Sequence, residues 1–176
     1  MVSRLITDTH EDLVEQSTAV FSEDRTYRYV LTRRWAPGPL CVFVMLNPSM
    51  ADAFRNDPTV KRCLDFARRE RAGALTVLNI FALRSTDPGA LYGHPDPIGP
   101  DNDRFLDLCT RDADLVVAAW GVHGAHLGRG ATVASQLAER GVWLACLGTT
   151  SAGFPRHPLY VRGDTPLMPY GERKAA

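Results

Sequence analysis

The chain has 176 residues, a length that suits one domain and leaves too little for two full domains. Hydrophobic residues make up 45% of it and charged residues 23%, which excludes disordered, collagenous and coiled-coil chains. Its 20 Lys and Arg balance its 20 Asp and Glu, so no overall positive field attracts it to duplex DNA or to an anionic membrane. Any surface for nucleic acid must therefore be local.

The sequence carries no sign of a membrane segment or a metal site. No apolar run approaches the roughly 20 residues that span a bilayer, and residues 1–7 lack the pattern of a secretory signal. We therefore expect no membrane contact and a cytoplasmic location. The cysteines show no CxxC pair and no Cys/His pair at metal-ligand spacing, so we expect buried, reduced thiols and neither metal nor cofactor.

We expect one domain over residues 25–165, with an N-terminal extension over 1–24 and a C-terminal tail over 166–176. Residues 26–35 (TYRYVLTRRW) alternate in part, which predicts an edge strand or a hairpin arm. Residues 41–46 (CVFVML) are continuously apolar and end at Asn47-Pro48, a pattern typical of a strand that is buried on both faces.

Helices and strands alternate after this strand. Asp57 as a cap and Pro58 as the first helical residue begin a helix that Gly73 ends. Further buried strands are predicted over 75–80, 114–120 and 142–147, and further helices over about 101–111 and 129–140. The sequence thus predicts an α/β fold: a three-layer α/β/α sandwich with a mainly parallel four-stranded central sheet, plus the N-terminal edge strand or hairpin.

Ligands bind such sheets beyond the carboxyl ends of the strands. The segments at these positions are 47–53 (NPSMADA), 79–88 (NIFALRSTDP), 120–124 (WGVHG) and 148–160 (GTTSAGFPRHPLY). The loop over 81–100 is rich in Pro and Gly, and we expect a connection of this length to line or cover the site. Basic residues over 55–71 either contact phosphates or form the solvated face of a helix.

Two asparagines stand at predicted strand ends. Pro48 holds Asn47 in extended geometry, where its amide either orients a water or a substrate edge or starts a turn. Asn79 lies in an apolar strand, so its amide must find partners or cost about 1–3 kcal/mol. It either braces a neighbouring loop or offers a donor and an acceptor to the edge of a nucleobase.

His157 lies between Pro155 and Pro158, which stiffen its backbone. A neutral imidazole there either stabilises a developing oxyanion or has a structural role, and His123 has the same two readings. Three carboxylates remain open as the base of a reaction or as caps: Asp52, Asp57 and Asp87. The sequence contains no GxSxG, P-loop, HExxH or GxGxxG motif, which disfavours enzymes defined by a single motif.

Six ordered motifs between about residues 27 and 161 carry a resemblance. They are MLNPSMADA, DPTVKRC, LNIFALRSTDP, GPDND, VVAAWGVHG and PRHPLYV. In this order they resemble the bacterial and phage family called domain of unknown function 1643, a name that implies no activity.

The strand-end segments also resemble, more distantly, those of the uracil-DNA glycosylase superfamily. Asn47-Pro48 is similar to the Asn-Pro variant of its water-positioning motif, and Asn79 to the residue that reads the base edge. The VVAAWG segment is similar to the strand before the final helix, and His157-Pro158 to the motif whose His stabilises the leaving base.

The second resemblance implies a uracil-DNA glycosylase-like N-glycosidic hydrolase in DNA repair or modification, acting on a base in DNA or on a nucleoside or nucleotide. Asn47 and His157 would be its catalytic residues, one positioning water and the other binding the departing base. Phe54 or Phe81 would stack on the base, and Arg84 and Arg156 would contact phosphate. The expected substrate-binding residues are Asn79, Pro48, Ser49, Phe54, Phe81, Arg84, Trp120, Gly121, His123 and Arg156.

The asparagine at position 47 and the neutral net charge favour an alternative, and the sequence departs from that superfamily elsewhere too. Residue 47 is Asn where the most active glycosylases have Asp, which implies weak water activation and slow turnover. Leu159-Tyr160 follows His157-Pro158 where Ser-Pro would stand, and the cysteines do not match an iron-sulfur ligand pattern. The alternative is a non-catalytic nucleotide-binding or modified-base-binding domain, and a third reading is an interaction domain without a ligand. The sequence leaves the oligomeric state open.

Overall fold

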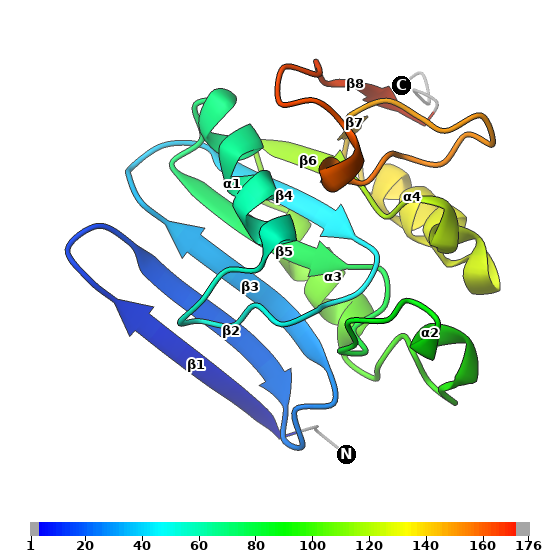
Figure 1. Cartoon of the computed structure of the whole chain (residues 1–176), viewed down its shortest axis with the longest axis horizontal. Helices are drawn as coiled ribbons and strands as arrows, with labels where there is room; N and C mark the ends of the chain where they lie inside the picture. Colours follow the sequence, from blue (N-terminus) through cyan, green and yellow to red (C-terminus); the bar gives the residue numbers. More distant parts are fainter. Residues whose placement is uncertain (1–3, 172–176) are drawn as a thin grey trace.

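One eight-stranded sheet runs through the computed structural model, which describes residues 4–171 (Figure 1). Its strands are β1 (Leu5–Glu11), β2 (Gln16–Ser22), β3 (Arg28–Arg34), β4 (Leu40–Met45), β5 (Ala74–Asn79), β6 (Leu115–Ala118), β7 (Leu144–Cys146) and β8 (Met168–Tyr170). The helices are α1 (Pro58–Arg69), α2 (Ala90–Gly93), α3 (Asn102–Thr110) and α4 (Arg129–Glu139), with 3-10 turns η1 (Val122–Gly128) and η2 (Pro158–Tyr160). The α/β class is therefore confirmed.

The sheet is mixed, in the order β1-β2-β3-β5-β4-β6-β7-β8. The neighbours β5–β4, β4–β6 and β6–β7 pair in parallel, whereas β1–β2, β2–β3, β3–β5 and β7–β8 pair antiparallel. The prediction of a mainly parallel, four-stranded sheet is therefore wrong: the sheet is larger, and most of its pairings are antiparallel. The four apolar runs of the sequence mark only the strands that are buried on both faces.

Segments expected outside the domain belong to the sheet at both of its edges. Residues 5–22 form the β1–β2 hairpin, and residues 168–170 form β8. β3 is a hairpin arm, as predicted, but it is no edge strand, because β2 covers its outer side and β5 its inner side. These strands were missed because β1 and β8 are largely exposed and carry no apolar run.

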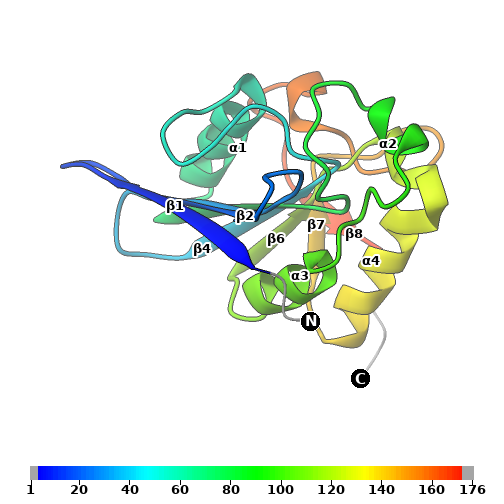
Figure 2. The same cartoon turned by 90° about the horizontal axis from the view of Figure 1, so that it is seen from below.

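Helices cover both faces of the parallel part of the sheet (Figure 2). α1 packs on the face that carries Phe43 and Met45, and α3 and α4 pack on the face that carries Val42 and Val44. Successive side chains of a strand point to opposite faces, so one apolar run serves both cores. The outcome is three layers, with the antiparallel strands extending the middle one.

The predicted start of α1 is confirmed. Asp57 caps the helix, since its Oδ1 accepts a hydrogen bond of 2.8 Å from the backbone nitrogen of Val60, and Pro58 is the first helical residue. The cap sets where the first turn of α1 lies relative to the ends of β4 and β5.

Two glycines allow close packing against Trp120, which follows β6 and is 1% exposed. A Cβ atom on Gly124 would lie 2.2 Å from Cδ1 of the indole, and one on Gly130 would lie 2.6 Å from its Nε1. η1, which contains Gly124, and the first turn of α4, which contains Gly130, can therefore approach the indole only because these positions lack side chains.

We predict that Gly130→Ala destabilises the protein by about 1–3 kcal/mol through overpacking, although alanine favours a helix by about 1 kcal/mol over glycine. Gly93→Ala is the matched control, because a Cβ there meets no heavy atom within 4 Å. Urea unfolding of both variants measures the difference. A Gly130→Ala protein as stable as wild type would contradict the packing described.

Candidate functional site

A cavity of about 390 Å³ lies at the carboxyl ends of β4 and β5, beside the first turn of α1. All four strand-end segments contribute to it, through the predicted residues Asn47, Ser49, Asn79, Trp120, Gly121, His123, Arg156 and His157. Ser85, Thr86 and Pro88 from the long loop line it as well. Its volume falls in the range of about 300–1,000 Å³ that is typical of small-molecule sites.

Four predicted substrate-binding residues do not line this cavity. Phe54 is 65% exposed and packs against His10, whereas Phe81 is fully buried in the core. Arg84 lies over the ring of Phe21 and donates to the carbonyl of Arg25, and Pro48 is buried. The structure therefore does not bring Phe54 or Phe81 to a base, or Arg84 to a phosphate, because each serves a packing contact elsewhere.

Asn79 is the last residue of β5, and its backbone is held from two helices. Asn102 at the start of α3 donates from Nδ2 to the carbonyls of Asn79, at 2.9 Å, and Ile80, at 3.1 Å. Arg129 at the start of α4 donates to the carbonyl of Ile80 at 2.8 Å.

The side chain of Asn79 takes no part in these hydrogen bonds, which all go to backbone carbonyl groups. The residue is 2% exposed, lines the cavity, and its Nδ2 has no hydrogen-bond partner in the described part of the chain. A buried donor of this kind is costly unless something binds it. Two roles were predicted for Asn79, bracing a loop or binding a ligand. Among the described residues, Nδ2 makes no hydrogen bond to a loop, so it does not brace one.

Asn47 does brace the loops. Its Nδ2 lies within hydrogen-bond distance of the carbonyls of Pro48, Leu83 and Ser85, the best at 3.0 Å to Ser85. No donor among residues 4–171 binds its Oδ1, so this is the atom that remains for a water or a ligand. The amide therefore joins two strand-end loops and keeps one acceptor at the cavity.

Arg28, at the start of β3, is a cavity residue that the sequence analysis missed. It is 2% exposed, and its Nη1 donates to the carbonyl of Ala51 at 2.6 Å. Its Nε is buried without a partner, and no carboxylate of the described residues forms an ion pair with it. Burial lowers the pKa of Arg28 to about 10 and Asp57 opposes this effect, so the side chain is still a cation at neutral pH.

Arg33 holds the same loop but does not line the cavity. Its guanidinium donates to the carbonyl of Asp52 at 2.5 Å and to Oδ1 of Asn56 at 3.0 Å, and it forms an ion pair with Glu15. Arg28 and Arg33 together fix the loop between β4 and α1. The sequence offered one signal for these two residues, namely that both arginines lie within a segment predicted to be a strand.

His157 has a defined tautomer in its neutral form. Its Nδ1 accepts a hydrogen bond of 3.3 Å from the backbone nitrogen of Leu159, which leaves the ring proton on Nε2. Burial lowers the pKa of His157, with Asp57 acting in the opposite direction. The ring is therefore a neutral hydrogen-bond donor at pH 7.

Other side chains that line the cavity near His157 are more exposed. Arg156 donates to the carbonyl of Thr149 at 3.0 Å, and Nδ1 of His123 bonds the hydroxyl of Tyr92 at 3.0 Å. Thr150 and Tyr160, which the sequence analysis did not single out, complete this side of the cavity.

Of the three carboxylates left open by the sequence, Asp57 lines the cavity. Its two oxygens accept from the backbone nitrogens of Val60 and, at 3.4 Å, Ala51. Asp52 and Asp87 do not line the cavity and instead accept from backbone nitrogens of their own loops. The carboxylate at the cavity thus already has a structural function as a cap.

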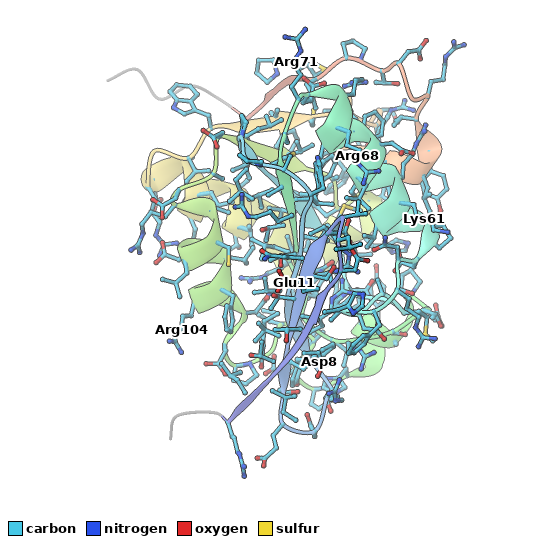
Figure 3. All side chains as sticks on the ribbon, turned by 90° about the vertical axis from the view of Figure 1, so that its left-hand side faces the viewer. Asp8, Glu11, Lys61, Arg68, Arg71 and Arg104 are labelled. Carbon is cyan, nitrogen blue, oxygen red and sulfur yellow. The ribbon has the colours of Figure 1, made fainter. Side chains whose placement is uncertain are left out.

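The basic residues over 55–71 do not gather at the cavity. Arg62 and Arg69 donate to carbonyl groups over residues 158–165 and so hold the chain after η2. Lys61 is exposed on α1 (Figure 3).

Residues 28–159 match the family described as protein of unknown function (DUF1643). The chain belongs to this family. The matched segment begins at Arg28 and includes every cavity residue named above except Tyr160. No curated protein and no solved structure matches the chain, and no finding supports the resemblance to the uracil-DNA glycosylase superfamily.

In the part of the chain that the structure describes, no helix has the length and apolar character needed to cross a membrane. Within residues 4–171, no group of three or more His, Cys, Asp or Glu could hold a metal ion.

The lowered pKa of His157 makes stability depend on pH. In the unfolded chain His157 binds its proton at a pKa near 6.5, whereas in the folded chain it does so only at lower pH. The contribution of the neutral His157 to the free energy of unfolding is therefore fully present above pH 6.5 and is lost as the pH falls through the folded pKa. We predict that the melting temperature falls less between pH about 7.5 and about 5 in His157→Asn than in wild type. Asn retains an acceptor for Leu159 but does not titrate. Parallel pH curves for the two proteins would contradict the half-buried, neutral imidazole.

Proposed function

We propose that this cavity binds a nucleobase and that the protein hydrolyses its N-glycosidic bond, in DNA or in a nucleoside or nucleotide. The observation that carries the proposal is the amide of Asn79: the residue lines the cavity, and its buried Nδ2 has no partner among the described residues. A carboxamide presents a donor and an acceptor side by side, and nucleobase edges present the complementary pair.

The reaction follows from the other polar groups of the cavity. A water accepted by Oδ1 of Asn47 attacks the sugar C1′, and the electron pair of the glycosidic bond leaves with the base. The Nε2 proton of His157 binds the departing base as it gains negative charge. The proton lost by the water ends on the base nitrogen that was bonded to the sugar, so no further reactant is consumed.

One observation favours the non-catalytic alternative. Asp57 is the carboxylate that lines the cavity, and its oxygens already accept two backbone hydrogen bonds, while Asn47 cannot accept a proton. A protein that binds a base without releasing it would show the same cavity. Base binding and base release must therefore be measured separately.

For binding, we expect free bases or nucleosides to raise the melting temperature of wild type, because a ligand that binds only the folded state stabilises it. Asn79→Ala should abolish this shift. Asn56→Ala is the control, since Asn56 bonds Arg33 and does not line the cavity, and it should keep the shift. Equal shifts in the two variants would rule out Asn79 as the residue that reads the base.

For catalysis, we expect slow release of free base from an oligonucleotide or nucleoside by wild type. His157→Asn should reduce kcat by about 100-fold with little change in base affinity, because it removes a donor used as charge develops. Chromatography of the released base measures this. Binding without release in wild type would contradict the hydrolase and support the non-catalytic binding domain.

A further inference from the structure

Three buried side chains that line the cavity have a donor without a partner among residues 4–171: Nδ2 of Asn79, Nε of Arg28 and Nε1 of Trp120. The indole Nε1 lies against Gly130, whereas Asn79 and Arg28 have polar side chains, and within the described residues the Arg28 guanidinium makes one hydrogen bond, to Ala51. Arginine is almost never fully buried unless it is paired. An acceptor-rich ligand would meet this requirement for both residues.

The antiparallel pairing of β3 with β5 explains why Arg28 and Asn79 line the same cavity. Leu31 lies opposite Val77 in the register, so the start of β3 lies beside the end of β5, and the backbone nitrogen of Arg28 donates to the carbonyl of Ala82 at 3.0 Å. Arg28 and Asn79 therefore reach one cavity from adjacent strands.

We propose that Arg28 and Asn79 together select a 6-oxopurine, a proposal that rests on the proposed base-binding function. The carboxamide of Asn79 pairs with N1–H and O6 of the base, and the guanidinium of Arg28 pairs with O6 and N7. The pair O6 and N7 is the edge that arginine recognises most often in nucleic acids.

Other bases satisfy this pair of residues less well. Uracil has an N–H and an oxygen for Asn79 but a C–H where a 6-oxopurine has N7, so the donors of Arg28 stay unpaired. Adenine keeps N7 but carries a 6-amino donor that would face the donors of Arg28. Each mismatch leaves a buried donor without an acceptor, which is the strongest source of selectivity in polar sites.

The charges around Arg28 favour a neutral base over a phosphate. Asp57 lines the same cavity and acts on the charge of Arg28, so its carboxylate would repel a phosphate dianion placed beside Arg28, while the other cation of the lining, Arg156, is exposed. Asp52 and Asp57 stabilise the charge of Arg28, whereas the nearby Arg33 and Arg84 oppose it. A neutral 6-oxopurine satisfies the donors of Arg28 without bringing a second negative charge next to Asp57.

The structure offers a matched pair of variants. Arg28→Gln keeps a donor for the carbonyl of Ala51 but loses the charge and the paired donors. Arg33→Gln is the control: Arg33 is on the same strand, is equally buried at 2% exposure, and holds the same loop, but it does not line the cavity.

The test is calorimetric titration of the three proteins with hypoxanthine, 7-deazahypoxanthine, adenine, uracil and inorganic phosphate. We expect wild type to bind hypoxanthine at least about tenfold more tightly than adenine, uracil or 7-deazahypoxanthine, in which a C–H replaces N7. Arg28→Gln should bind hypoxanthine and 7-deazahypoxanthine equally, because the two changes remove the same contact. Arg33→Gln should keep the wild-type ratio.

Other results overturn the inference in distinguishable ways. Binding of bases by wild type without a preference for N7 and O6 would refute 6-oxopurine selection and leave base binding intact, even if Arg28→Gln failed to fold. Tighter binding of uracil would assign the site to pyrimidines. Phosphate that competes with bases and is lost in Arg28→Gln would make Arg28 an anion site, and a wild type that binds no base would refute the proposed function as well.

Discussion

The irregular backbone at the ends of β4 and β5 is buried, and its carbonyl groups need hydrogen-bond donors. Long side chains from other elements supply them: Arg28 and Arg33 to the loop after β4, and Asn102 and Arg129 to the end of β5. Asn47 joins the two loops through its own amide. These five side chains therefore fix the backbone around the cavity.

The mixed sheet is part of this arrangement. β4 and β5 run in parallel and carry Asn47 and Asn79 to one edge, as ligand sites of α/β proteins require. β3 runs in the opposite direction, so its first residue, Arg28, arrives at the same edge. A wholly parallel sheet would present only strand ends there. The added antiparallel strand contributes a buried cation, Arg28, to a cavity whose other charged lining residues are the exposed Arg156 and the capping carboxylate of Asp57.

The sequence predicts the parts of this structure that depend on local physics. Continuous apolar runs identify the four parallel strands, and Asp57-Pro58 identifies the start of α1, because a cap acts within one turn. The strand-end rule also brings the four predicted segments to one cavity. Arg28 and the burial of Phe81 were missed for a common reason: both depend on which strands become neighbours, and pairing between distant segments leaves no periodic signal in a single chain.

We propose that the free donors of Asn79 and Arg28 serve a ligand and not the protein itself. Crystal structures without ligand and with hypoxanthine, at a resolution that shows ordered water, test it most directly. We expect the base in the cavity with O6 and N7 within about 3.2 Å of the two side chains, and only exchangeable water there in the free protein. A water held identically in both structures, bonded to Asn79 and to neighbouring backbone, would show that the amide is structural and would contradict a ligand-binding role for Asn79.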